Sequence, residues 1–156
     1  FQALAPSGYN FVGWTGGFLG QSIVTGRYTI DAVDYDDPDL AEYLTITAVF
    51  RERLLVSYSI DSQYSNSFFL REEVNDGYYV SGVKTPVAKD GYTFVGWHIA
   101  VVNADGTITG IGEIFDLAND TVDSELCNST GTAIGSTYKM LQLVAVFEDA
   151  EGNEVW

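Results

Sequence analysis

The sequence predicts a mainly β or α+β protein with little helix, in which one small strand unit occurs twice. Three observations support this prediction. The heptapeptide GYNFVGW at residues 8–14 returns as GYTFVGW at residues 91–97. The segments around both copies are rich in β-branched and aromatic residues, which are typical of strands. Finally, no segment shows the long apolar period of 3.6 residues that an amphipathic helix needs.

The repeat extends beyond the heptapeptide. Residues 2–14 align without gaps on residues 85–97, at an offset of 83. Further along, LTITAVF at 44–50 matches LQLVAVF at 141–147, at an offset of 97. Two landmarks that recur in the same order indicate one supersecondary unit used twice.

The two copies differ in length at two places. The second copy holds 97 − 83 = 14 more residues between its landmarks, and we place them at about 98–137, a stretch rich in Gly, Thr, Asn and Asp. It also has about thirty residues before its heptapeptide, 54–83, where the first copy has seven. We therefore predict a partial first β-repeat unit at 1–52, which lacks its opening strand, and a complete second unit at 53–156.

Short segments predict the individual elements. In both heptapeptides the Gly before Tyr suits a turn, and the Gly before Trp suggests a β-bulge with the Trp turned inward as an anchor. The two closing segments are dense in apolar and β-branched residues, as expected of buried central strands. The remaining predictions are a helical turn at 36–44, a strand at 53–60, a strand or one short helix at 66–74, and a hairpin at 101–111 that turns at residues 103–106.

The charge of the chain excludes two classes of partner. Its 22 acidic and 7 basic residues give a net charge of −15, which repels nucleic-acid phosphates and anionic lipid headgroups. No apolar run approaches the ~18 residues that a membrane-spanning helix needs. We therefore expect a protein that binds no nucleic acid and does not span a membrane.

Catalytic residues are scarce, so we predict that the protein is not an enzyme. His98 is the only histidine and Cys127 the only cysteine, and nothing in the sequence brings them together. Cys127 has no basic neighbour, which indicates a buried, inert thiol, and a single cysteine forms no intrachain disulfide. The stretch GWTGGFLG at 13–20 lacks the Lys-Ser/Thr of a phosphate-binding loop. We expect no cofactor, apart from calcium as a candidate ion.

Two groups of residues are candidates for binding. Five carboxylates lie within nine residues and repel one another, and a calcium ion would relieve that repulsion; a solvated acidic loop is the alternative interpretation. Exposed aromatic rings form the second group, because rings stack on sugar faces. The candidate calcium ligands are Asp31, Asp34, Asp36, Asp37 and Asp39, and the candidate ligand-binding rings are Tyr78, Tyr79 and Trp156.

The repeated motif carries a family resemblance. It consists of Gly91, Tyr92, Phe94, Gly96 and Trp97 in the second copy and of Gly8, Tyr9, Phe11, Gly13 and Trp14 in the first, and each copy is closed by a strand ending in Val-Phe. On these residues the chain resembles the Listeria–Bacteroides repeat, the internalin B-repeat-like family found in tandem on bacterial surface proteins. The resemblance covers about 54–148 as a full unit and 1–50 as a partial one. It implies a β-grasp-like (ubiquitin/SUMO-like) fold for each unit.

For function, the resemblance implies a non-enzymatic structural or adhesion module, a tandem spacer or stalk, in an extracellular, cell-surface or cell-wall protein. Its implied partners are neighbouring repeats or subunits, or a host or glycan surface. Two alternatives remain open. Because the first unit lacks its opening strand, a neighbouring subunit that donates a strand would make the chain a filament or pilus-like subunit. Exposed rings together with the insertion at 98–137 would instead form a carbohydrate-binding module.

Overall fold

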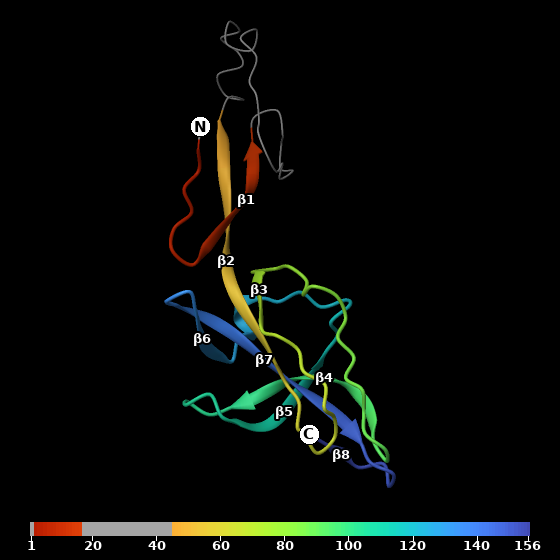
Figure 1. The fold of residues 1–156 in the computed structure, drawn as a ribbon. Coiled ribbons are helices and arrows are strands. Elements are labelled where there is room, and N and C mark those ends of the chain that lie inside the picture. The colour runs from red at the N-terminus through yellow and green to blue at the C-terminus, as the bar shows by residue number, and fades with distance from the viewer. Residues whose placement is uncertain (1, 17–44) are drawn as a thin grey trace, which may run out of the picture. The chain divides into compact units, whose positions relative to one another are not determined.

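The computed structural model describes residues 2–16 and 45–156, and the predicted mainly β class is confirmed for them (Figure 1). The chain forms two compact units, Phe1–Glu52 and Arg53–Trp156. No helix among the described residues is long and apolar enough to cross a membrane. The described elements are β1 (Tyr9–Gly16), β2 (Ile46–Ser59), β3 (Glu72–Asn75), β4 (Thr93–Val102), β5 (Ile108–Phe115), the 3₁₀ helix η4 (Ser124–Leu126), β6 (Ser129–Ala133), β7 (Ser136–Glu148) and β8 (Glu154–Val155).

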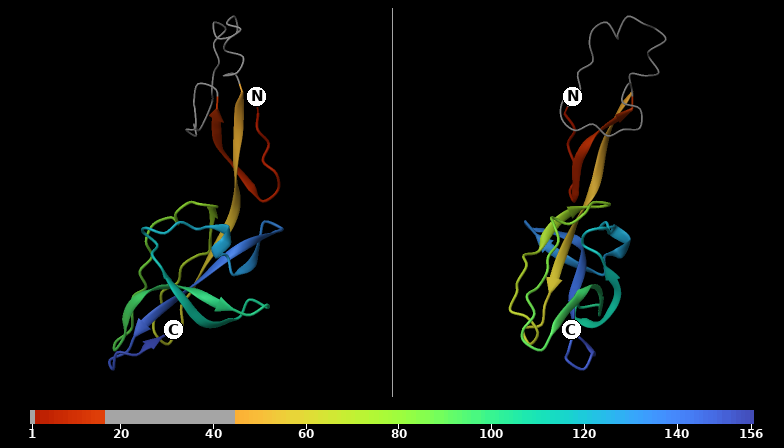
Figure 2. Two further views of the ribbon diagram at one scale, coloured as in Figure 1. Left: turned by 180° about the vertical axis from the view of Figure 1, so that it is seen from behind. Right: turned by 90° about the vertical axis from the view of Figure 1, so that its right-hand side faces the viewer.

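The unit Arg53–Trp156 is a mixed sheet with β7 at its centre (Figures 1 and 2). Residues 53–59 of β2 run beside β7 in the parallel direction, and β4 runs beside its other edge in the antiparallel direction. β3 extends the sheet beyond β2, and β5 extends it beyond β4, so the order is β3-β2-β7-β4-β5. The short strands β6 and β8 pair with parts of β7 that β4 and β2 leave open.

Both faces of β7 are buried, which explains its nearly continuous apolar sequence. On one face, Leu141, Leu143, Ala145 and Phe147 are each 0% exposed and belong to the main core. The opposite face is also buried, and there Tyr138 and Met140 pack with Leu55 in a smaller cluster. The sequence-based prediction of a buried central strand at 141–147 is confirmed.

A crossover, residues 60–92 with β3 inside it, connects β2 to β4. Its two arms are joined where Ser65 pairs with Ala88 and the Ser65 hydroxyl donates to the Val87 carbonyl at 2.8 Å. The Val87 N–H in turn donates to the Ser67 hydroxyl at 2.8 Å. The predicted strand or helix at 66–74 is therefore correct only at its end, because these serine hydroxyls replace ladder hydrogen bonds before β3 begins.

Two other sequence predictions have clear outcomes. The hairpin at 101–111 is confirmed, since the Asn103 N–H donates to the Thr107 carbonyl at 2.9 Å between β4 and β5. The strands expected at 44–50 and 53–60 form one strand, β2, without a loop between them. Residues 51–53, Arg-Glu-Arg, contain neither Gly nor Pro and continue the extended backbone. The helical turn predicted at 36–44 lies outside the described residues.

The repeated heptapeptide has the same strand register in both units, and the bulge predicted before Trp is confirmed in both. In each copy the register shifts between Phe and Gly, which leaves Val12 or Val95 as the extra residue. In β1 and β2 the paired residues are Phe11 with Phe50, Gly13 with Val49 and Trp14 with Ala48. In β4 and β7 they are Phe94 with Phe147, Gly96 with Val146 and Trp97 with Ala145.

The turn before each heptapeptide strand is also repeated. The Tyr9 N–H donates to the Pro6 carbonyl and the Tyr92 N–H donates to the Lys89 carbonyl, both at 3.1 Å. Gly8 and Gly91, the third residues of these turns, have φ values of +82° and +87°. That left-handed conformation strongly favours glycine, so the backbone explains the first letter of the repeated heptapeptide.

Candidate functional site

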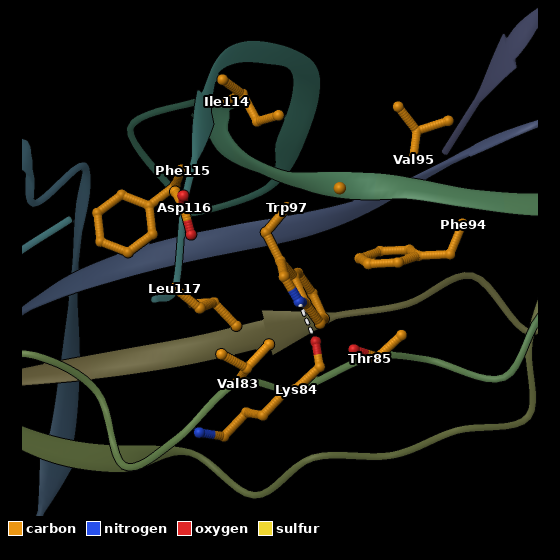
Figure 3. Close-up of a pocket in the computed structure, with 11 residues that line it drawn as sticks. Val83, Lys84, Thr85, Phe94, Val95, Trp97, Ile114, Phe115, Asp116 and Leu117 are labelled. Carbon is orange, nitrogen blue, oxygen red and sulfur yellow. Dashed lines mark hydrogen bonds between the residues drawn. The ribbon is translucent and has the colours of Figure 1, made fainter. Parts of the chain in front are cut away.

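Trp97 stands at the centre of an aromatic cluster that fastens the crossover to the sheet. Its ring is 3% exposed and packs edge-on against Tyr58, Phe94 and Phe69, with ring centroids 5.2, 5.9 and 6.0 Å away. The indole Nε1 donates to the Lys84 carbonyl at 2.7 Å, as the dashed line in Figure 3 shows. A single side chain of β4 therefore holds both the core and the crossover backbone.

A largely buried carboxylate lies on the crossover in the same region. Glu72 Oε1 accepts a hydrogen bond from the Tyr58 hydroxyl at 2.6 Å and an ion pair from Lys84 Nζ at 2.6 Å. Its Oε2 accepts hydrogen bonds from the backbone N–H and the hydroxyl of Ser81. Lys84 Nζ also lies 4.8 Å from the centre of the Tyr58 ring. Every partner of Glu72 is thus a donor, which favours its ionised form.

The pKa values follow from this network. Burial alone would raise the pKa of Glu72, but the hydrogen bonds from Lys84, Ser81 and Tyr58 outweigh it and lower the pKa to about 2. Burial, the hydrogen bond to Glu72 and the charge of Glu72 all raise the pKa of Tyr58 well above its ordinary value. At neutral pH Glu72 is therefore ionised, the Tyr58 hydroxyl keeps its proton, and both oxygens of the carboxylate accept hydrogen bonds within the protein.

An open groove of about 360 Å³ lies beside Trp97 (Figure 3). Its rim carries exposed apolar side chains, with Val83, Val95 and Ile114 exposed by 64%, 42% and 61%. Asp116, also in the lining, is held by the Ala118 N–H and the Asn119 amide, and the Asn119 hydrogen bond is the main reason that its pKa is lowered. The groove offers mainly apolar contact surface, with Lys84, Thr85 and Asp116 as its charged and polar side chains. It is lined by Val83, Lys84, Thr85, Phe94, Val95, Gly96, Trp97, Ile114, Phe115, Asp116 and Leu117.

The predicted ligand-binding rings are exposed but do not line this groove. Tyr78 and Tyr79 lie on the crossover and are 43% and 60% exposed. Tyr78 is fixed by backbone pairing with Val122, whose N–H donates to its carbonyl at 2.8 Å. Trp156 follows β8 and is 39% exposed. Tyr78 and Tyr79 are adjacent in the chain, and Trp156 lies on a different segment, after β8. All three rings remain candidates for ligand binding.

The predicted calcium ligands Asp31, Asp34, Asp36, Asp37 and Asp39 all lie outside the described residues. Within 2–16 and 45–156, no group of three or more His, Cys, Asp or Glu side chains is arranged to hold a metal ion.

His98 and Cys127 each lie within contact distance of a backbone carbonyl. Nδ1 of His98, on β4, lies 2.9 Å from the Gly112 carbonyl of the neighbouring strand β5. Cys127 is half-buried directly after η4, and its Sγ lies 3.9 Å from the Asp123 carbonyl. The His98 ring thus contacts the backbone of a neighbouring strand, and the Cys127 thiol contacts a carbonyl four residues before it.

Asn128 is a structural side chain that sequence reasoning missed. On one edge of β7, β6 pairs up to Met140 and β4 pairs from Leu143, and Asn128 lies at the gap. Its Oδ1 accepts from the Gln142 N–H at 2.9 Å, and its Nδ2 donates to the carbonyls of Ala100 at 2.7 Å and Gln142 at 3.2 Å. The amide therefore takes the place of strand backbone. No local pattern identifies it, because its partners are 28 and 14 residues away.

Comparisons of the chain with protein-family models, with curated proteins and with solved structures find no match. The functional interpretation therefore depends on the internal repeat and on the geometry of the described residues.

Proposed function

We propose that this chain is a non-enzymatic structural or adhesion module of a bacterial surface or secreted protein, built from tandem β-grasp-like units of the Listeria–Bacteroides repeat kind. The observation that carries the proposal is the repeated geometry. Both copies have the same turn, the same bulge and the same pairing of Trp with Ala. A strand unit reused in order along one chain is the arrangement of spacer proteins, in which modules repeat to set a length.

The strand order supports the β-grasp assignment. In a β-grasp sheet the first and last strands lie parallel at the centre, the second strand flanks the first, and a hairpin of the third and fourth flanks the last. In Arg53–Trp156 the five places are taken, in chain order, by β2, β3, β4, β5 and β7. Residues 76–92 of the crossover, which follow β3 and form no helix, take the place of the β-grasp helix.

The polar groups of the second unit support a non-enzymatic role. Glu72 is bonded to three side chains, Trp97 to a backbone carbonyl and Asn128 to two strands. These groups hold the fold together, and their hydrogen-bonding capacity is used within the protein. The proposed partners are accordingly neighbouring repeats or a host or glycan surface.

Location on the cell tests the proposal directly. An antibody raised against Arg53–Trp156 should label intact cells of the source organism, or detect the protein in their medium, without lysis. Brief protease treatment of intact cells should remove the label, while a cytoplasmic control protein survives. Label that appears only after lysis would contradict the proposed surface or secreted location.

A second candidate, a filament subunit completed by strand donation, is favoured by one observation. In the second unit, β7 has β4 on one edge and the parallel strand of β2 on the other. In the first unit, residues 46–51 of β2 have β1 on one edge, and no described strand lies on the other. By equivalence with β7, that edge accepts a parallel strand like residues 54–59.

Solution mass separates the two candidates. Light scattering of the purified chain over a range of concentrations should give a monomer if the chain is a spacer module. Oligomers that grow with concentration, and that shrink when a peptide of residues 53–60 is added, would favour strand donation instead. The peptide supplies the sequence of the proposed donor strand without the rest of a subunit.

A further inference from the structure

We propose that the parallel pair formed by β2 and β7 is a mechanical clamp that keeps Arg53–Trp156 folded when the chain is pulled from both ends. The inference rests on the proposed structural function and adds to it a property of the fold. It names the hydrogen-bond ladder that carries the load and the direction in which it resists.

The direction in which the pair resists force follows from the strand topology. β2 is the first strand of the unit and β7 is its last long strand, and they are parallel neighbours. Their register runs from Leu55 with Met140 to Ser59 with Val144. In a parallel pair the two starting ends lie together, so tension on the start of β2 and on the end of β7 slides one strand along the other. All the hydrogen bonds between them are then loaded at once.

Tension on the two ends of the chain reaches the β2–β7 pair through the segments that adjoin it. Upstream, residues 46–52 of β2 continue into residues 53–59 without a loop. Downstream, β8 folds back on β7 through only two residue pairs, Phe147 with Val155 and Glu148 with Glu154. An antiparallel hairpin that is pulled at its open end separates one pair at a time. β8 therefore detaches at low force and passes the load to the end of β7.

The hydrogen bonds between β2 and β7 are also shielded from water, and other strands flank the pair. Leu54 and Val56 of β2 and Leu141 and Leu143 of β7 are 0% exposed and belong to one core. β3 covers the outer edge of β2, and β6 and β4 cover the outer edge of β7. Water has no direct access to the strained hydrogen bonds, so it cannot replace them singly as the strands begin to slide.

Single-molecule pulling in two directions tests the clamp. In both proteins Cys127→Ser removes the native thiol. One protein is held by handles at its two chain ends, and the other by cysteines introduced as Arg51→Cys and Ile134→Cys. Both introduced positions are exposed, and they lie four and six residues before Leu55 and Met140, the first pair of the ladder, so tension there peels the strands apart from one end.

We expect the unit to rupture at a force at least twofold higher in the end-to-end direction than in the peeling direction, at equal pulling speed. The end-to-end event is identified by a length gain on the order of 300 Å, the extended length of the released residues. Equal forces in the two directions, or a lower end-to-end force, would overturn the clamp.

A matched pair of variants separates mechanical strength from stability. Val56 and Val122 are both 0% exposed and belong to the same core, but only Val56 lies in the clamp. Val56→Ala and Val122→Ala should lower stability to urea by similar amounts, while Val56→Ala lowers the end-to-end force more. If Val122→Ala lowers that force as much, the clamp is wrong. The pulling and unfolding measurements do not depend on the cell-labelling experiment. The clamp proposal and the proposed surface location can therefore be contradicted separately.

Discussion

The same heptapeptide meets two different surroundings in this chain. Trp14 and Trp97 pair with equivalent alanines, and each packs edge-on against the Phe three residues before it, at 5.1 and 5.9 Å. Yet Trp97 is 3% exposed and bonded to the crossover, whereas Trp14 is only half-buried. The closing residues differ likewise, with Phe147 at 0% exposure and Phe50 half-buried.

The comparison separates two kinds of information in the motif. Turn, bulge and strand register are the same in both copies, so they depend on the motif and its closing strand. Burial differs, so it depends on strands and loops contributed from elsewhere in the chain. The described part of the first unit has one strand pair, while the second unit has a full sheet and a crossover.

The largest difference between the copies is expected on removing the tryptophans. Trp97→Ala should destabilise the second unit by about 3–5 kcal/mol, because a buried ring and its cluster are lost. Trp14→Ala should destabilise the first unit by about 1–2 kcal/mol, since a half-buried ring loses less apolar contact. Amide hydrogen exchange in β1 and β4 measures the two units separately.

Trp97→Phe keeps the comparison testable if Trp97→Ala does not fold. It retains a ring but loses the Nε1 hydrogen bond to Lys84, at a cost of about 1 kcal/mol plus the lost packing. Equal losses for the two Trp→Ala variants would show that burial does not distinguish the copies.

The second difference is sensitivity to acid. Glu72 has an ordinary pKa of 4.5 and a folded-state pKa of about 2. A lowered pKa means that its contribution is complete above pH 4.5 and is lost as the pH falls toward 2. Glu72→Gln should cost about 1–3 kcal/mol at neutral pH, since four donor groups on Tyr58, Lys84 and Ser81 lose a charged acceptor.

Urea unfolding between pH 7 and pH 2 measures this effect in the second unit. The difference in stability between the wild-type chain and Glu72→Gln should shrink as the pH falls from 4.5 toward 2. Glu151→Gln, an exposed carboxylate near the C-terminal turn, is the control and should leave the curve nearly unchanged. A difference that stays constant down to pH 2 would argue against the Glu72 network.

The third effect concerns the insertion that lengthens the second copy. Asn128→Ala should cost about 1–3 kcal/mol, because it leaves the Gln142 N–H and two carbonyls without their partner inside the sheet. Asn119→Ala removes an exposed amide with one hydrogen bond to Asp116 and should cost under about 0.5 kcal/mol. Thermal unfolding of the two variants compares them, and similar midpoints would contradict the bridging role.

The smallest effect is one in which the copies should agree. Gly8→Ala and Gly91→Ala each place a Cβ on a left-handed residue with open space around it. Each should cost about 1 kcal/mol from backbone strain alone. Hydrogen exchange in β1 and β4 reports both, and a clearly larger loss in the second unit would mean that the turn depends on its surroundings.

Local chemistry accounts for what the sequence predicted correctly. The turn at Gly91, the bulge before Trp97 and the hairpin at 103–106 involve residues close together in the chain, so their backbone preferences suffice. The buried strand at 141–147 is recognisable because a strand covered on both faces reads as a continuous apolar run.

Long-range contacts account for what it missed. Residues 66–71 have strand-like composition, but the Ser67 hydroxyl bonds with Val87, 20 residues away, and no ladder forms there. The partners of Glu72 at Tyr58 and Lys84 lie 14 and 12 residues away and are not implied by any local spacing.

The sequence by itself determined the strand class, the repeat and the local geometry of its heptapeptide, because those depend on backbone preference and apolar pattern. Only the tertiary structure decided that β2 and β7 are parallel neighbours, that Trp97 fastens the crossover, and that Glu72 is an ionised carboxylate held by hydrogen bonds. Each of these needs segments distant in sequence to meet, and the hydrogen bonds and burial that stabilise the meeting exist only once the sheet has formed.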